Sequence, residues 1–270
     1  MSKIFVLGYC LIFLVTTATA EPLNPALTDT WQFTVAAFNQ HNEAKFRVTS
    51  GDDAPIAIDM DDLGLQSSKW IPQVGIRWHY KKKWSLSIAF SDFQLASHKS
   101  IDKSFNFDGV TYPINASLKS DLDLSVYITS LDYALYQSDS TEWGVGFGLH
   151  GLDLSLKIDG SLNGISTGRA SEDFLVPLPN IRFYTRHAFS PKLLGSFSAG
   201  WLSATIDQYD GALLVGAVAL DYRFTERWSV GMNYQLIDID LKVDRGASDP
   251  KSRYELTLDG FSLTLRYGIP

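Results

Sequence analysis

Apolar and polar residues alternate along almost the whole chain after residue 20. A period of two residues is typical of β-strands that bury one face, and no later segment shows the 3.6-residue period of an amphipathic helix. Ten segments carry the alternation, which are residues 30–39, 69–80, 83–97, 119–137, 141–157, 173–188, 191–207, 210–224, 226–243 and 253–269. The pattern therefore predicts an all-β fold of ten strands.

The first 20 residues depart from this alternation. Lys3 precedes an apolar run over residues 4–17, and small residues follow at 18–20. Such a run is typical of a secretory signal peptide and is too short to span a membrane as a helix. We expect residues 1–20 to be cleaved and residues 21–270 to form one domain. An uncleaved anchor is the alternative.

Composition excludes several classes of function. The chain has 270 residues, a net charge of −7 and one cysteine, Cys10, which lies inside the expected signal peptide. An acidic chain is not a typical nucleic-acid binder, and an exported chain without cysteine has no disulfide and no catalytic thiol. No GxSxG, HExxH, P-loop or CxxC motif occurs. We expect a protein that is not an enzyme, with no cofactor and no nucleic-acid partner.

Connections between the predicted strands alternate in length. Tight turns occur near residues 81–83, 138–141, 190–191 and 225–226, and long connections span 40–68, 98–118, 158–172 and 244–252. Short turns at one end and long loops at the other are typical of an outer-membrane β-barrel. We therefore predict an antiparallel transmembrane β-barrel with both termini at the short-turn, periplasmic end. A secreted two-sheet sandwich is the alternative.

Tryptophan and tyrosine recur where the predicted strands meet the short turns. Trp84, Trp143 and Trp228 each begin a strand whose next residues on the same face are apolar. Aromatic side chains at the end of an apolar band form the girdle of a membrane interface. A sandwich core has no need of them at one height.

In most strands the apolar phase reverses once, nearer the long loops. In segment 226–243 the apolar residues occupy even positions up to Leu236 and odd positions from Ile237 onward. Two explanations compete. In the first, each strand has a β-bulge at this height; in the second, the strands are regular and leave the bilayer there. Bulges would turn Asp238 and Asp240 into the lumen without partners, which is costly. We favour the second interpretation, in which the barrel extends above the membrane on the extracellular side around a dry, apolar upper lumen.

Below the reversal, the lumen-facing positions are polar. The candidate ligand-binding residues are Arg77, Arg182, Arg186, Arg223, Arg266, Asp132, Asp221 and His150. Other residues assigned to this lower lumen are Gln32, Thr34, His79, Tyr136, Tyr184, Asn233 and Gln235. Five arginines facing two aspartates suit an anionic ligand, and the alternative is an ion-pair network that stiffens a small barrel. His150 is interpreted as a hydrogen-bonded lumen histidine rather than a general base.

The first long loop is acidic. Asp59, Asp61 and Asp62 lie close together in sequence and suggest a Ca²⁺ or Mg²⁺ site. Their spacing does not match an EF-hand loop, so plain solvation is the competing interpretation.

Within that loop, the stretch from Ile58 to Leu65 (IDMDDLGL) is similar to a family of small proteobacterial outer-membrane β-barrels. In architecture the resemblance covers residues 21–270, and this loop is its only motif. The resemblance implies a Gram-negative outer-membrane location and the barrel assembly machinery as a partner. It implies no activity.

Three families of enzymatic barrels are natural comparators. Omptin proteases carry an Asp-x-His pair, and lipid A deacylases carry a His-x-Ser-Asn signature, and neither occurs here. Outer-membrane phospholipases place a serine two residues after a histidine. His98 and Ser100 have that spacing but fall in a predicted loop. No catalytic residue carries over.

The sequence thus predicts a non-enzymatic outer-membrane barrel with a structural or ligand-binding role and a largely filled lumen. Its partners are outer-membrane lipid, lipopolysaccharide and a small hydrophobic or anionic ligand. The first alternative is a narrow transporter for such a solute. The second is a surface hydrolase of omptin-like architecture.

Overall fold

The computed structural model describes residues 24–49, 56–59, 62–65, 68–102, 104–107, 110–206, 209–243 and 251–270. The expected signal peptide, residues 1–20, lies outside the described residues, so its cleavage stays a prediction. In the described part of the chain, no helix is long and apolar enough to cross a membrane.

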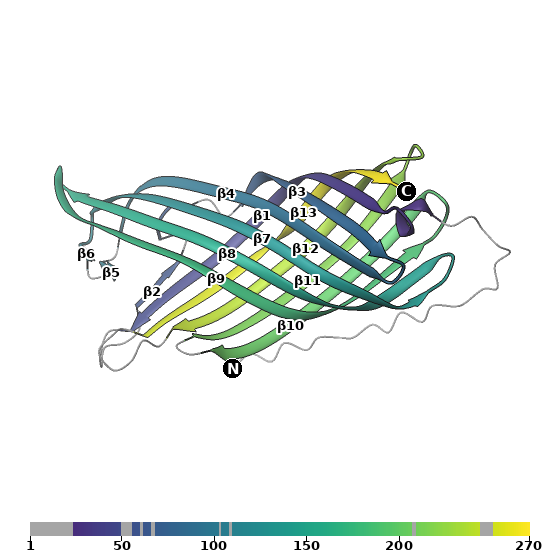
Figure 1. Ribbon diagram of the computed structural model, residues 1–270. Helices are drawn as coiled ribbons and strands as arrows, with labels where there is room; N and C mark the ends of the chain where they lie inside the picture. Colours follow the sequence, from purple (N-terminus) through teal and green to yellow (C-terminus); the bar gives the residue numbers. More distant parts are fainter. Residues whose placement is uncertain are drawn as a thin grey trace, which may run out of the picture.

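Ten antiparallel strands form a closed ring, as the sequence predicted (Figure 1). They are β1 (Trp31–Thr49), β3 (Ser68–Lys81), β4 (Trp84–Ser100), β7 (Ser117–Gln137), β8 (Thr141–Leu162), β9 (Ile165–Ala188), β10 (Leu193–Ile206), β11 (Tyr209–Arg223), β12 (Trp228–Val243) and β13 (Lys251–Ile269). Pairing of β1 with β13 closes the ring. The short strands β2 (Ile56–Asp59), β5 (Phe105–Phe107) and β6 (Val110–Tyr112) and the 3-10 helix η1 (Pro25–Leu27) complete the described elements.

The predicted long loop at residues 158–172 is wrong. β8 and β9 are joined there by a tight turn at Asn163 and Gly164, which have φ angles of 52° and 80°. Positive φ at both central residues is what a type I′ hairpin turn requires, and Asn-Gly supplies it. The other long connections also contain strand: β1 continues to Thr49, and β5 pairs with β6. Residues 244–250 lie outside the described part.

The strands stay regular where the apolar phase reverses. Along β8, Leu149 is exposed on the outer face, whereas His150 and Leu152 are buried on the inner face. Pairing of β8 with β7 is unbroken through these residues, and pairing of β12 with β13 is unbroken from Leu236 to Ile239. The reversal therefore occurs on regular strands and not at a row of bulges, as the favoured interpretation requires.

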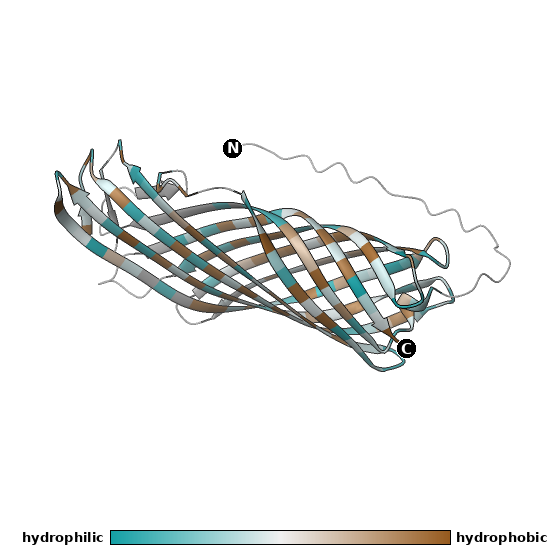
Figure 2. Ribbon diagram, turned by 90° about the horizontal axis from the view of Figure 1, so that it is seen from above, coloured by the Kyte–Doolittle hydropathy of each residue, from teal (hydrophilic) through white to brown (hydrophobic). Residues whose placement is uncertain are grey.

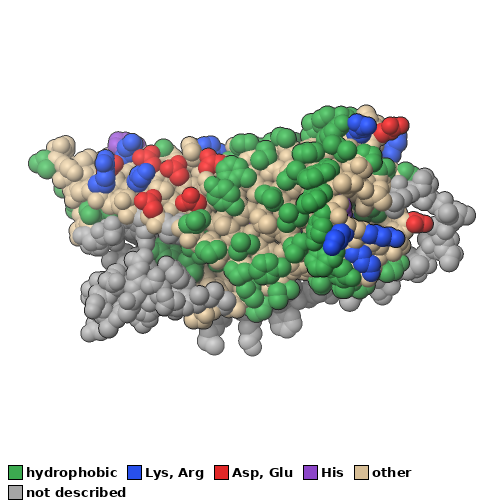
Figure 3. All heavy atoms as spheres, viewed as in Figure 1, with side chains coloured by type: hydrophobic (Ala, Val, Ile, Leu, Met, Phe, Trp, Pro, Cys, Tyr) green, Lys and Arg blue, Asp and Glu red, His purple; other side chains and the backbone are tan. Residues whose placement is uncertain are grey.

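The outer surface follows the same division. Figure 2 shows hydrophobic and hydrophilic residues alternating along the strands. Apolar side chains cover the middle of the barrel, and charged side chains lie toward its two ends (Figure 3). Arg169 donates hydrogen bonds to Asp159 across the β8–β9 pair, which lowers the pKa of that carboxyl. At the short-turn end, Trp31 stacks on Trp78 with ring centroids 5.1 Å apart. This pair belongs to the expected aromatic girdle.

The ring of paired strands is closed only in its lower part. Pairing of β3 with β4 ends at Gln73, and pairing of β9 with β10 ends at Ile181, although the described strands continue beyond both points. Toward the long-loop end, Pro72 lies next to the first end point, and Pro179 and Pro177 lie just beyond the second. Pairing with β1 and β8 continues through these prolines, so their nitrogens, which carry no N–H, face β4 and β10. The missing donors explain why both ladders stop.

Above these points the barrel consists of two sheets. Sheet A contains β4, β7, β8 and β9, and sheet B contains β10 to β13, β1, β2 and the upper end of β3, residues 68–72. The inner faces of the two sheets pack on each other. Leu154 of β8 and Leu178 of β9, from sheet A, line one small void together with Leu241 of β12, from sheet B. The side chains buried in this core include Phe93, Leu124, Leu154 and Ile158 from sheet A and Phe38, Leu213, Ile239 and Leu256 from sheet B. Burial of apolar side chains from both sheets fills the upper lumen.

Residues of the long-loop end complete this core. Leu63 and Leu65 of the 62–65 turn are buried in it, and so is Tyr112 of β6. The Tyr112 hydroxyl donates a hydrogen bond to the Ile158 carbonyl oxygen at 2.9 Å. The described loop residues therefore cover the top of the two-sheet core.

The core can be tested with two leucines of β7. Leu124 is buried between the sheets, and Leu131 lies on the lipid-facing side. We expect Leu124→Ala to lower the free energy of unfolding by about 2–5 kcal/mol, because it leaves a cavity in packed apolar surroundings. Leu131→Ala is the matched control and is expected to lose less. Equal losses in urea unfolding of lipid-reconstituted protein would contradict the two-sheet core.

Candidate functional site

The lower lumen brings together seven of the eight predicted site residues. Arg77, Arg182, Arg186, Arg266, Asp132 and Asp221 line two cavities there, and Arg223 lies beneath them at the short-turn end. His150 lies apart, at the upper limit of the polar lumen. Its Nδ1 is 2.9 Å from Nδ2 of the buried Asn180. Above this pair the lumen is apolar.

Most of the charge in the lower lumen is paired. Nη2 of Arg77 lies 4.0 Å from an Asp132 oxygen and 3.9 Å from a Glu142 oxygen. Nε of Arg182 lies 3.5 Å from the other Asp132 oxygen. Arg266 forms an ion pair with Asp221. These contacts match the network interpretation more closely than an array of free arginines.

Sequence reasoning missed two of the four carboxylates. Glu142 is buried at the start of β8, and Asp29 is buried just before β1. Glu142 lies on the same inward face of β8 as Gly144, Gly146 and Gly148. Glycine at every second position indicates a face that leaves room for neighbouring side chains, and it could have marked Glu142 as a lumen residue. Asp29 precedes the first alternating segment, so no pattern marked it.

Inward-facing glycines make room for the charged side chains. A Cβ at Gly146 would collide with the Asp132 carboxylate, and a Cβ at Gly268 would collide with that of Asp29. Any larger residue at either position would therefore displace a lumen carboxylate.

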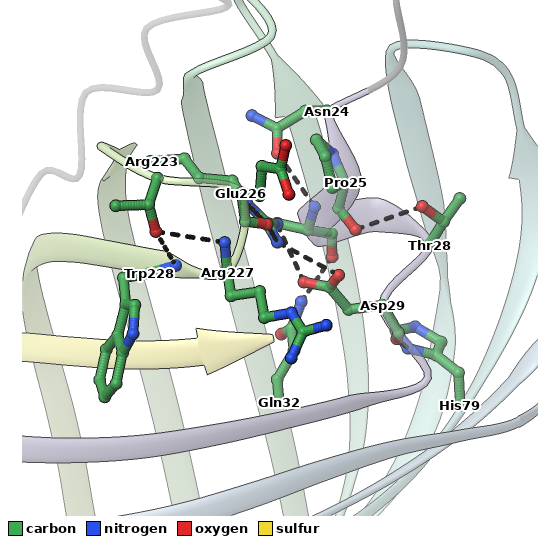
Figure 4. A network of polar contacts seen from close by, with 12 residues as sticks. Asn24, Pro25, Thr28, Asp29, Gln32, His79, Arg223, Glu226, Arg227 and Trp228 are labelled. Carbon is green, nitrogen blue, oxygen red and sulfur yellow. Dashed lines mark hydrogen bonds and ion pairs between the residues drawn. The ribbon is translucent and has the colours of Figure 1, made fainter. Parts of the chain in front are cut away.

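The segment before β1 lies at the short-turn end of the lumen, where its residues join the polar network that Figure 4 shows. Arg223 donates two hydrogen bonds to the Asp29 carboxylate, at 2.9 and 3.3 Å. Gln32 donates from Nε2 to the Ala26 carbonyl oxygen at 2.6 Å. Leu27 of η1 packs in a small buried apolar cluster with Ala188 and Leu194. We call residues 24–29 the N-terminal plug.

Tyr136 does not face the lumen as predicted. It is exposed on the outer surface and stacks with Trp143, with ring centroids 6.2 Å apart. The β7–β8 register shifts between Ala134 and Tyr136. The extra residue of such a bulge reverses the face of every residue after it, and sequence alternation alone did not reveal it.

Two adjacent cavities occupy the lower lumen, of about 230 and 190 Å³. Their linings share Arg77, Arg186, Ser196 and Arg266. The larger cavity reaches down to Ala26 and Asp29 of the N-terminal plug. A polar chamber therefore lies between this plug and the apolar core.

The acidic first loop is only partly described. Asp59 ends β2, Asp62 lies in the following turn, and Asp61 falls outside the described residues. No group of three metal-binding side chains occurs among the residues that the structure describes. The metal hypothesis for Asp59, Asp61 and Asp62 stays untested.

His98 and Ser100 lie on β4 and not in a loop, which corrects the prediction. At this upper end of β4 the alternation of apolar and polar residues is weak, because His98 and Ser100 are both polar. The sequence therefore did not indicate a strand. The hydroxyl near His98 is that of Ser117 on β7, whose Oγ is 3.0 Å from Nε2 of His98. Both side chains lie at the long-loop end of sheet A.

The Asp29–Arg223 pair is buried, with side-chain exposures of 3% and 5%. We expect Asp29→Asn to lower the free energy of unfolding by about 3–5 kcal/mol, because it leaves the buried Arg223 without a counter-charge. Asp210→Asn is the control, because its pair with Lys242 is exposed, and it should cost less than about 1 kcal/mol. Denaturant unfolding measures both. A loss for Asp29→Asn no larger than that of the control would contradict the buried plug.

Solved structures of outer-membrane proteins resemble this fold. The outer membrane protease OmpT from Escherichia coli aligns with a TM-score of 0.57 and 12% identity, over 94% of this chain and 100% of that one. OprG from Pseudomonas aeruginosa aligns with a TM-score of 0.38 and 11% identity, over 89% and 97%. No family model matches the sequence, and no curated protein matches it. The chain has the fold of Gram-negative outer-membrane β-barrel proteins.

Proposed function

We propose that this chain is a non-enzymatic outer-membrane barrel with a structural or ligand-binding role, and that its lumen conducts no ions. The two-sheet apolar core carries the proposal. The void between Leu154, Leu178 and Leu241 has a volume of about 20 Å³, which is room for about one water molecule. Ions do not cross a lumen filled with apolar side chains, because nothing there replaces their hydration.

The N-terminal plug supports the same proposal from the other end. Asp29 and Arg223 are buried against each other, and Asn24 donates a hydrogen bond to the Ser190 carbonyl oxygen at 3.3 Å. These contacts tie the plug to the opposite wall of the barrel. The lower chamber is thus bounded above and below.

Transport of a hydrophobic or anionic solute is the first alternative. The upper void is too small for an acyl chain, so passage would require sheets A and B to separate. That separation would expose the apolar core to water. We therefore rank a sealed barrel above a transporter.

A surface hydrolase is the second alternative. The His98–Ser117 pair is the arrangement closest to a base and nucleophile. A catalytic histidine also needs a group that orients its other ring nitrogen. Across the described ranges, the His98 ring makes no second hydrogen bond or ion pair. The proposal therefore assigns no catalysis.

Lipids are the proposed partners of the outer surface. The apolar band faces acyl chains, and the acidic face above it lies at the level of lipopolysaccharide. At the short-turn end, Lys81, Lys82 and Lys83 are exposed, and Lys83 lies over the Tyr133 ring at 5.7 Å. Such cations are suited to phospholipid headgroups. Insertion by the barrel assembly machinery belongs to the same proposal.

Planar-bilayer conductance tests the seal. We expect the refolded wild type to be silent and Leu154→Ser/Leu241→Ser to conduct, because hydroxyls admit water between the sheets. Asp153→Ser/Lys242→Ser is the matched control, because it changes water-facing residues of the same two strands, and it should stay silent. Steady current through the wild type would contradict the proposal. Silence of the Leu154→Ser/Leu241→Ser variant would place the seal elsewhere in the lumen.

A further inference from the structure

We infer that the lower chamber binds a small oxyanion, such as inorganic phosphate, through Arg186. The inference rests on the proposed ligand-binding role and names the ligand class. Arg186 stands apart from the other four lumen arginines, each of which has a carboxylate within 4.0 Å. Within the described part of the chain, the Arg186 side chain has no ion pair and no hydrogen bond.

The nearest carboxylate by register is already engaged. Glu142 pairs with Arg186 across β8 and β9, so both side chains face the lumen. One Glu142 oxygen lies 3.9 Å from Arg77, and the other accepts a hydrogen bond from Gln137 at 2.9 Å. Among the described residues, the lower lumen thus holds five arginines and four carboxylates, and Arg186 is the uncompensated cation.

Arg186 is partly buried, which makes this excess charge significant. Nη1 of Arg186 is shielded from solvent and has no hydrogen-bond partner. A partly buried cation without a counter-charge is unfavourable, so the folded protein is stabilised by an anion that reaches it. A guanidinium offers two parallel N–H donors, which match the geometry of phosphate and carboxylate oxygens.

The cavities provide the room. Arg186 borders both of them, together with the Ser196 hydroxyl and Arg266. A cavity of about 10–15 Å³ is enough to hold one water molecule. A cavity of about 230 Å³ therefore accommodates a tetrahedral oxyanion with water around it.

The position of the chamber indicates where the anion comes from. The larger cavity borders Ala26 and Asp29 of the N-terminal plug, whereas the apolar core closes the other side. An anion therefore has to enter from the periplasmic end, where contacts of the plug must open to admit it. We commit to a free anion of that compartment as the source, and not to the phosphate of a lipid headgroup.

Titration with inorganic phosphate tests the inference. The mature chain is refolded in zwitterionic micelles at low salt, and its Tm is followed as phosphate is added, with calorimetry for the affinity. We expect the Tm of the wild type to rise with phosphate, because the anion binds only the folded state. Arg186→Gln should show no rise and should be no less stable than the wild type without phosphate. Arg169→Gln removes an exposed arginine outside the lumen and should behave as the wild type.

Two further arms keep the outcome decisive. If Arg186→Gln fails to fold, Arg186→Lys keeps the charge without the guanidinium fork and should show a smaller rise. Micelles doped with phosphatidylglycerol replace free phosphate in the second arm. A shift with the lipid alone would overturn the assignment to a free anion.

No rise for the wild type, or an equal rise for Arg186→Gln, would overturn the inference. Neither result touches the seal, which the conductance experiment measures separately. A current through the wild type would in turn remove the proposed function and leave the phosphate titration standing.

Discussion

A strand that passes from hydrocarbon into water meets two different requirements, and the rest of this structure depends on that change. Inside the bilayer every backbone N–H and C=O needs a partner in the protein, so the ring of strands is closed there. Above it, water satisfies open edges. The two ladders stop beside Pro72 and Pro179, where an unpaired edge costs little. The barrel can therefore divide into two sheets without leaving backbone groups in lipid.

The same change sets the contents of the lumen. Below it, apolar side chains face lipid and the polar ones are turned inward, so their charges must be balanced inside the protein. Asp29, Asp132, Glu142 and Asp221 balance all the lumen arginines but Arg186. Above it, apolar side chains point inward. Sheets A and B pack against each other because this packing removes the apolar side chains from water. A polar chamber beneath an apolar seal follows from one strand pattern.

Sequence showed the parts of this arrangement that are local. Side chains alternate between the two faces of one strand. The strand period, the aromatic girdle, the phase reversal and the inward direction of residues such as Arg182 all follow from that alternation. The division into two sheets depends on which strands stop pairing, and prolines within alternating segments did not indicate that. Tyr136 was misplaced because a bulge changes parity without changing composition. Asp29 was missed because its partner, Arg223, lies 194 residues away.

The central claim is that the phase reversal marks the passage from lipid to water on regular strands. The expected mature chain has no cysteine, so single cysteines along β12 can carry a spin label in reconstituted vesicles. At Met232 and Tyr234 the account predicts high accessibility to oxygen. At Asp238 and Asp240 it predicts high accessibility to a water-soluble nickel chelate, and at Ile239 low accessibility to both. High oxygen accessibility at Ile239, with Asp238 shielded from the chelate, would contradict it and restore a bulge at this height.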